Sequence, residues 1–267
     1  MSVIDWNSIK PSFNFVGWEN YQRIFTSFRF QSSMRNMLFF SIFFIAGVVI
    51  SGLSLAIFLD RKVRGKWIYR NIFLFPMALS FVVTGIAWRW ILNPAAGVNI
   101  FLEKIGISPQ WYTDTAILFG FDLDQIEMGI PIALFSVILA AIWQMTGFSL
   151  AMYLAGLASI PKEMKEAAII DGANSWQIYT RVVLPQLKPI TFGLVLIMLQ
   201  ISLKNFDLVY TMTGSGPNFV TDTPAIYMYE ATFKSNFYAE GAAVAIVLLV
   251  VVMMFVLPAK LREGRNQ

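Results

Sequence analysis

Cysteine and histidine are both absent from this chain of 267 residues. Their absence excludes disulfides, thiolate nucleophiles and imidazole bases, and it removes the usual ligands of zinc. Charge is also scarce, because Asp, Glu, Lys and Arg make up 13% of the residues, whereas a typical soluble domain has about 25%. These absences argue against most active sites and against an ordinary soluble globule.

Hydrophobic residues fill 57% of the chain and gather in five long stretches. A bilayer core about 30 Å thick is crossed by about 20 mostly apolar residues in a helix, which satisfies its own backbone polar groups. The stretches that meet this requirement are residues 36–59, 72–92, 129–161, 190–212 and 241–259. The sequence therefore predicts an all-α polytopic membrane protein with about five transmembrane helices.

The positions of Lys and Arg predict the orientation, because cytoplasmic loops are enriched in them. Basic residues gather in the first and third connections and in the tail: Arg61, Lys62, Arg64, Lys66 and Arg70; Lys162, Lys165, Arg181 and Lys188; Lys260, Arg262 and Arg265. We therefore expect an extracytoplasmic segment at 1–35, a transmembrane domain at 36–260 and a cytoplasmic tail at 261–267. Basic residues in the first segment, among them Arg29 and Arg35, run against this rule. Because the basic residues lie between apolar runs, no nucleic-acid partner is expected.

The predicted cytoplasmic loop at 159–189 has a helix–turn–helix pattern. Pro161 suits the start of a helix, and Gly172 can end it in a left-handed conformation. Asn174 or Ser175 can cap a second short helix, which Pro185 would terminate. The loop is rich in apolar side chains: Met164, Ala167, Ala168, Ile169, Ile170, Trp176, Ile178 and Tyr179. These side chains either pack on the protein's own helices or dock into a groove on a partner.

The same loop carries a family resemblance. Its run Glu166-Ala167-Ala168, followed by Gly172 and by Val182-Val183-Leu184-Pro185, resembles the EAA loop of binding-protein-dependent ABC importer permeases. Other segments are similar to the carbohydrate-uptake branch of that family, which includes the maltose and glycerol-phosphate permeases: Trp88-Arg-Trp-Ile-Leu-Asn-Pro94, Trp143-Gln-Met-Thr-Gly-Phe148 and Thr213-Gly-Ser-Gly-Pro217. Two departures stand out: Val182 replaces the more usual Ile, and the membrane helix that family members normally carry before Asp5 is missing.

The resemblance implies the type I permease fold of ABC importers in a prokaryotic cell membrane. It implies a sugar cargo delivered by an external solute-binding protein, with glycerol phosphate or another small polar solute as the alternative. The implied partners are a second permease subunit and two cytoplasmic ATPases, which would bind ATP and Mg. This chain would itself hold no catalytic residue, metal or cofactor, and it contains no GxxxxGK loop. The implied ATPase-coupling residues are Glu166, Ala167, Ala168, Asp171, Gly172, Ala173, Leu184 and Pro185.

Polar residues inside the predicted spans are candidates for the solute pathway. Gln144, Gln200 and Asn205 are amides that donate and accept hydrogen bonds, as hydroxyl-rich sugars require, although such amides more often join helices. Lys204 and Asp207 lie three residues apart on one predicted helix, so they can pair. Two other classes fit less well. An intramembrane enzyme would need a nucleophile with a base, which this sequence does not offer. A stand-alone channel would give the apolar cytoplasmic loop no role.

Overall fold

The computed structural model describes residues 1–60, 65–106, 109–123 and 126–263. The basic residues Arg61, Lys62, Arg64 and Arg265, which contribute to the predicted orientation, lie outside these ranges. The loop and tail assignments that depend on them remain predictions.

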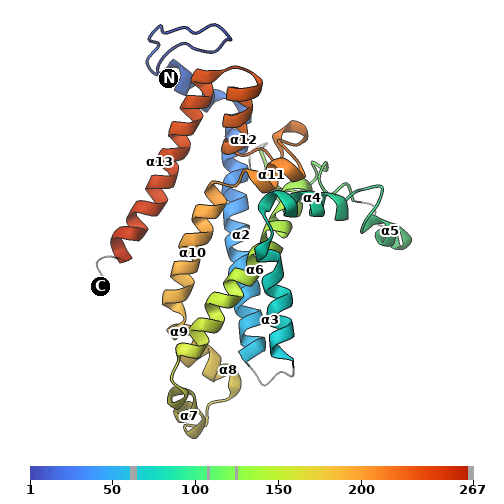
Figure 1. The fold of residues 1–267 in the computed structure, drawn as a ribbon, viewed down its shortest axis with the longest axis vertical. Helices are drawn as coiled ribbons and strands as arrows, with labels where there is room; N and C mark the ends of the chain where they lie inside the picture. Colours follow the sequence, from blue (N-terminus) through green and yellow to red (C-terminus); the bar gives the residue numbers. More distant parts are fainter. Residues whose placement is uncertain (61–64, 107–108, 124–125, 264–267) are drawn as a thin grey trace. The chain divides into compact units, whose positions relative to one another are not determined.

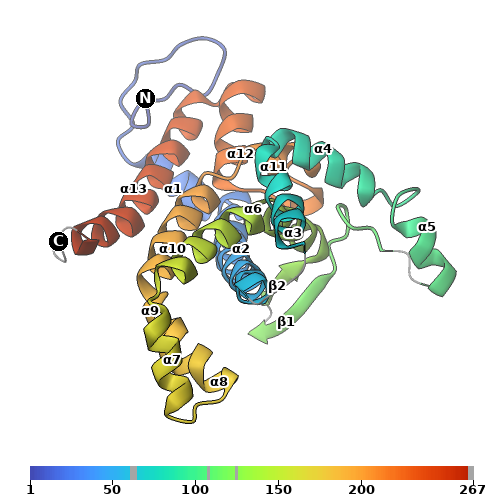
Figure 2. The same cartoon turned by 60° about the horizontal axis from the view of Figure 1, so that its bottom comes forward.

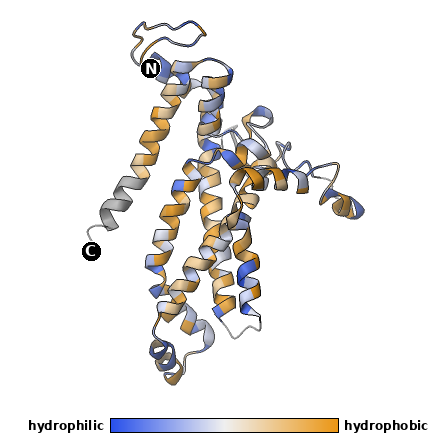
Figure 3. Ribbon diagram, viewed as in Figure 1, coloured by the Kyte–Doolittle hydropathy of each residue, from blue (hydrophilic) through white to orange (hydrophobic). Residues whose placement is uncertain are grey.

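Helices dominate the described chain, as predicted (Figure 1). Within the described residues, three helices are long and apolar enough to cross a membrane: α2 (Phe28–Asp60), α6 (Ile132–Ser159) and α13 (Tyr238–Glu263). The number rises to five if each of two bent pairs is one span. One pair joins α3 (Lys66–Leu74) and η1 (Phe75–Ala78) to α4 (Phe81–Ile91), and the other leads into α10 (Lys188–Leu203). Apolar residues cover much of α2, α6 and α10 in Figure 3.

Shorter elements connect these helices. They are α1 (Glu19–Thr26), α5 (Asn99–Leu102), η2 (Glu103–Ile105), α7 (Lys162–Ile170), α8 (Ser175–Gln177), η3 (Ile178–Val183), α9 (Leu184–Gln186), α11 (Asp207–Met212), η4 (Pro217–Phe219), α12 (Pro224–Tyr229) and η5 (Glu230–Lys234). The strands β1 (Ile117–Leu123) and β2 (Ile126–Pro131) form an antiparallel hairpin, in which Ile117 lies opposite Pro131. This hairpin is a small addition to the predicted all-α fold. It occupies a segment rich in β-branched and aromatic residues.

Two of the predicted spans are broken where the sequence suggested one helix. The predicted helix at 190–212 is wrong, because α10 ends at Leu203 and α11 begins at Asp207. Asn205, a poor helix former, lies in this break. The predicted helix at 72–92 is interrupted at Leu79–Ser80, three residues after Pro76, whose ring nitrogen donates no backbone hydrogen bond.

The chain divides into two compact units. The first contains residues 1–43, 81–140 and 200–267. Its apolar cluster joins α1, the start of α2, α12, η5 and α13 through Ile24, Phe30, Tyr227, Ala231, Ala243 and Val244. Each of these side chains is at most 4% exposed, so the cluster holds the ends of these helices together.

The second unit contains residues 44–80 and 141–199, and small residues bring its helices close together. A Cβ atom at Gly52 of α2 would overlap the Ser149 side chain of α6, and one at Gly147 of α6 would overlap the carbonyl oxygen of Phe73 in α3. Such contacts are typical of membrane helices, where backbones approach closely at small residues. Gly147 therefore sets how near α3 lies to α6.

We predict that Gly147→Ala destabilises the protein, because the new methyl group would have to displace backbone. Overpacking of this kind costs about 1–3 kcal/mol. The matched control is Gly193→Ala in α10, where nothing lies within 4 Å of the added Cβ. This change should be neutral or stabilising, by up to about 1 kcal/mol of helix propensity. Thermal unfolding of both purified variants in detergent tests the difference, and equal midpoints would contradict the packing argument.

Candidate functional site

The turn after α7 is closed by its own backbone. Gly172 has a φ of +79°, in the left-handed region that favours glycine. The Gly172 N–H donates to the Ile169 carbonyl at 3.0 Å, and the Ala173 N–H donates to the Ala168 carbonyl at 2.9 Å. This pair of bonds is a Schellman motif, which satisfies carbonyls left open at a helix end. The predicted left-handed end at Gly172 is confirmed.

The second helix begins at a reciprocal cap. The Gln177 N–H donates to the Asn174 side-chain oxygen at 2.9 Å, and the Asn174 N–H donates to Gln177 Oε1 at 2.9 Å. Asn174 is thus the capping residue, and Ser175 is the first residue of α8. The predicted stop at Pro185 is wrong. The helical path continues through the π-helical η3 into α9, where Pro185 lies in the first turn and its missing N–H is tolerated.

The pair of short helices, residues 161–187, presents apolar side chains to its surroundings, and we call it the coupling hairpin. Ile170 is 86% exposed, Trp176 is 77% exposed and Ile169 is 60% exposed. Figure 2 shows α7 and α8 lying side by side. The alternative in which these side chains pack on the protein's own helices therefore fails for them within the described residues. Of the expected coupling residues, Glu166, Ala167, Asp171, Gly172 and Pro185 are exposed, and Ala168, Ala173 and Leu184 are half-buried.

Two features attach the coupling hairpin to the second unit. Val183 and Leu187 are buried, at 0% and 1% exposure, and anchor its second half. Lys165 of α7 forms an ion pair with Asp60 at the end of α2, with 3.1 Å between Nζ and Oδ2. Both side chains of this pair are about one quarter exposed, so it contributes at most about 1 kcal/mol. The buried anchors fix the hairpin's base, and its apolar tip stays exposed.

Gln144 lies in the second unit and is 1% exposed. Its Nε2 donates to the Leu79 carbonyl at 2.7 Å, at the interruption between η1 and α4. Its Oε1 has no hydrogen-bond partner among the described residues. Joining helices is the commoner role weighed for such an amide, and Gln144 performs it here.

The other four pathway candidates belong to the first unit. Gln200 is exposed in the last turn of α10, and Lys204 is exposed in the break that follows. Asn205 is half-buried there, and Asp207 is exposed at the start of α11. Among the described residues, Lys204 and Asp207 do not form the predicted ion pair, because the helix expected to align them ends at Leu203.

A partly buried charge cluster in the first unit was not predicted from the sequence. Arg29 Nε lies 2.7 Å from Asp222 Oδ2, and Arg29 Nη2 lies 2.6 Å from Glu230 Oε2. Asn36 Nδ2 donates to the Phe219 carbonyl at 2.8 Å and to the Asp222 carbonyl at 3.1 Å. The cluster explains why Arg29 stands against the orientation rule, because two carboxylates neutralise it. The unexpected position of Arg29 was the one sign in the sequence that this side chain pairs with a carboxylate.

Burial dominates the electrostatics of Asp222, which lies in the loop before α12. Its side chain is 0% exposed. Burial raises the pKa of Asp222 from 3.8 to about 6, although Arg29 opposes the rise. A carboxylate held this way depends on its partner for charge compensation.

Comparisons with known proteins agree with the resemblance in the sequence. Residues 47–259 match the family described as "Binding-protein-dependent transport system inner membrane component". The chain belongs to this family. A probable ABC transporter permease of Pyrococcus horikoshii is 39% identical over 262 residues, which cover 97% of this chain and 85% of that protein. The xylose/arabinose import permease XacH of Haloferax volcanii is 34% identical, covering 95% of this chain and 76% of that one.

The fold of the permease also matches a solved structure. A bacterial ABC transporter involved in the import of the acidic polysaccharide alginate superposes with a TM-score of 0.80 at 24% identity, covering 94% of this chain and 84% of that one. At this identity the likeness concerns the fold. The chain is thus a membrane-embedded permease subunit with the ABC importer permease fold, and it is a transport component rather than an enzyme.

Removing Arg29 should destabilise the permease. Arg29→Met leaves Asp222 buried without its cation, and breaking such a pair costs about 3–5 kcal/mol. Because the folded-state pKa of Asp222 is raised, protonation favours the folded protein, and this contribution is lost as the pH rises through about 6. The loss of Arg29 raises that pKa further. The variant's deficit should therefore be smaller at about pH 5 than at about pH 8.

The control for this prediction is Lys165→Met, which removes a cation from the partly exposed pair with Asp60. It should change the free energy of unfolding by at most about 1 kcal/mol. Denaturation midpoints of both variants, followed by tryptophan fluorescence in detergent at the two pH values, give the comparison. Equal losses for the two variants, or a deficit that does not vary with pH, would contradict the account of Asp222.

Proposed function

We propose that this permease carries a sugar, delivered by an external solute-binding protein, through an ATP-driven importer. The proposal draws support from relatives whose names state sugar transport, including a multiple sugar-binding transport system permease of Streptococcus mutans that is 32% identical over 98% of this chain and 86% of its own length. A related solved complex is described as an alginate ABC transporter with a pentasaccharide-bound periplasmic protein. A second permease subunit and two ATPases, which bind ATP and Mg, complete the proposed assembly.

The exposed apolar tip of the coupling hairpin is the observation that carries the proposal. A large apolar side chain such as Ile170, left in water, forgoes about 1.5–3 kcal/mol of burial. The tip lies on the side that the basic loops predict to be cytoplasmic, where the ATPases work. We assign it to a groove on an ATPase subunit. Movement of that subunit would then reach α6 and α10, which flank the hairpin.

The closed geometry of the hairpin suits this role. The Schellman motif at Gly172 and the reciprocal cap at Asn174 fix the turn without help from a partner. The buried side chains of Val183 and Leu187 then join the turn to the helices. A lever of this kind transmits displacement because few of its dihedral angles are free to absorb it.

The solute pathway is assigned to residues that break or join helices. Gln200, Lys204, Asn205 and Asp207 cluster along the chain at the α10–α11 break, where three of them stand outside regular helix or at its end. Irregular backbone at membrane depth is tolerated where it lines a cavity or is buried in protein. Gln144 is a separate candidate within the second unit, because its Oε1 is not used by the bond to Leu79.

A solute bearing a phosphate, such as glycerol phosphate, is the alternative cargo. The exposed ammonium group of Lys204 favours it, because a phosphate needs a cation close by. Neutral sugars need amides and hydroxyls instead, which the pathway residues also offer. The two cargoes therefore make different demands on Lys204.

We predict that Ile170→Asp separates the permease from its ATPase subunits. Loss of one buried apolar anchor weakens association by at least roughly tenfold, and a buried carboxylate adds to the loss. Capture of the affinity-tagged permease from membranes, followed by quantification of the co-purified ATPase, measures the effect. The control is Phe233→Asp, a similar change at a side chain that is 70% exposed in the segment predicted to face outward. Normal ATPase recovery with Ile170→Asp would overturn the docking assignment.

Reconstitution tests the cargo. The whole complex is reconstituted in proteoliposomes, with the binding protein in the external buffer and ATP inside. We expect these proteoliposomes to accumulate a labelled neutral sugar such as xylose or maltose. Lys204→Gln should leave this uptake largely intact, because a neutral sugar has no charge to compensate. Accumulation of glycerol phosphate in place of sugars, abolished by Lys204→Gln, would select the alternative.

A further inference from the structure

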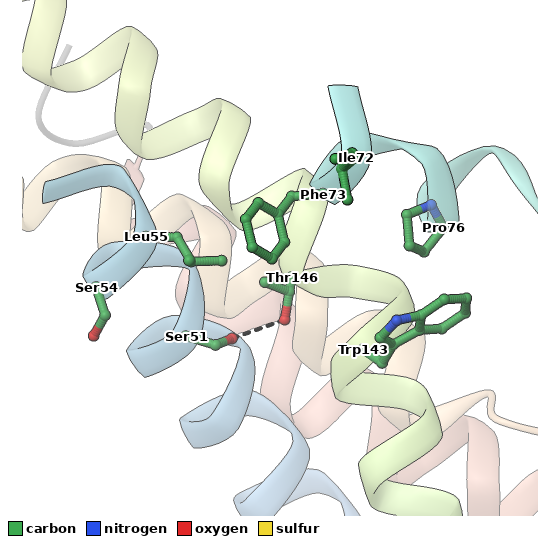
Figure 4. Close-up of a pocket in the computed structure, with 8 residues that line it drawn as sticks. All are labelled: Ser51, Ser54, Leu55, Ile72, Phe73, Pro76, Trp143 and Thr146. Carbon is green, nitrogen blue, oxygen red and sulfur yellow. Dashed lines mark hydrogen bonds between the residues drawn. The ribbon is translucent and has the colours of Figure 1, made fainter. Parts of the chain in front are cut away.

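A cavity of about 480 Å³ lies in the second unit, between α2, α3 and α6 (Figure 4). Its size falls within the range of small-molecule sites. It is lined by Ser51, Ser54, Leu55, Ile72, Phe73, Pro76, Trp143 and Thr146. In the close-up, the Trp143 ring of α6 lies near Pro76 of η1, and the Phe73 ring lies between Leu55 and Ile72. Nothing in the proposed transport cycle uses this cavity.

The lining is suited to an apolar guest. Thr146 Oγ1 donates to the Ile142 carbonyl at 2.7 Å, and the Ser51 hydroxyl lies 2.8 Å from Thr146 Oγ1. These two hydroxyls therefore satisfy one another and the backbone. A sugar needs many polar partners on its ring, whereas this cavity offers mainly aromatic and aliphatic surface. The chemistry of the lining thus favours a hydrocarbon chain.

The depth of the cavity places it in the inner half of the membrane. Ser51 lies nine residues before Asp60, the last residue of α2, a distance of about 14 Å along a helix. The basic loops predict that this end of α2 is cytoplasmic, and half of the hydrocarbon core is about 15 Å thick. A chain entering the cavity would therefore come from the cytoplasmic leaflet.

Positive charge lies on α3, on the cytoplasmic side of the cavity. Lys66 and Arg70 precede Phe73 by seven and three residues, so all three lie on one face of the helix. Both basic side chains are exposed. The carboxylate of Asp60, which could repel an anion, is paired with Lys165 at 3.1 Å.

Aromatic side chains mark the same end of α3 as an interfacial segment. Trp67 is 68% exposed and Tyr69 is 44% exposed. Trp and Tyr are enriched at the level of lipid headgroups. Basic residues at that level, on the cytoplasmic side of a helix, attract anionic headgroups.

We propose that this cavity binds one acyl chain of an anionic phospholipid from the cytoplasmic leaflet, with its phosphate held by Lys66 and Arg70. The chain would fill the space between α2, α3 and α6, next to the contact between Gly147 and Phe73. The site is independent of the solute carried and rests only on the predicted membrane orientation.

Photolabelling of the assembled importer tests the proposal. The complex is reconstituted in nanodiscs of phosphatidylcholine containing a phosphatidylglycerol probe with a diazirine on one acyl chain. Peptide mass spectrometry should find the label concentrated on the α3 and α6 segments around Phe73 and Trp143. The double variant Lys66→Gln/Arg70→Gln should reduce this labelling by at least roughly fivefold, because each cation near the surface contributes to binding an anionic lipid.

The matched control is Lys260→Gln/Arg262→Gln, which removes the same charge elsewhere on the predicted cytoplasmic side and should leave the labelling unchanged. A phosphatidylcholine probe should label the cavity weakly in every variant. Labelling that both double variants reduce alike, or that is no stronger around Phe73 than along α13, would overturn the proposal. So would protection by the transported solute, which would assign the cavity to the transport path. Labelling of the isolated permease but not of the assembled importer would also overturn the proposal, because the second permease subunit would then cover the cavity.

Discussion

Lipid cannot hydrogen-bond a peptide carbonyl, so each interruption of a membrane helix must be closed from within the protein. In the second unit, one buried amide meets this constraint: Gln144 Nε2 donates to the Leu79 carbonyl at 2.7 Å. Gly147, one turn further along α6, allows the Phe73 backbone to approach. The hydrogen bond and the close contact together fix α3 and η1 against α6. The apolar cavity is therefore bounded on that side by helices that these two contacts hold together.

The first unit solves a different problem, which is the cost of burying charge. Asp222 is fully buried, and its carboxylate is compensated by Arg29 from a position 193 residues earlier in the chain. Asn36, on the same face of α2 two turns later, holds the backbone around Asp222. The start of α2 is thereby joined to the loop between α11 and α12. An arginine that appears misplaced in the sequence becomes the residue that organises this unit.

Local chemistry made the coupling hairpin predictable. A left-handed glycine and an Asx cap depend on residues within a few positions, and both Gly172 and Asn174 behave as their residue types require. The positions of the apolar stretches were also readable, because bilayer thickness sets their length. The break after Leu203 was not predicted, because apolar residues resume at Leu208 and the polar Lys204, Asn205 and Asp207 are also compatible with one continuous helix that carries an ion pair. Pairings such as Arg29 with Asp222 depend on tertiary structure. A single sequence shows that a basic residue lies in an unexpected segment, but it does not show which carboxylate pairs with it.

The turn between α7 and α8 is held by four short-range bonds, all made within the hairpin itself. If the proposed ATPase subunit binds this turn, it binds a turn that is already ordered. The conformational entropy of that loop is lost when the permease folds, so ordering the loop does not reduce the affinity for a partner. Association can then be strong enough to persist through many cycles while the contact area stays small. Movement of an ATPase subunit bound in this way would be transmitted to the permease with little bending of the turn between α7 and α8.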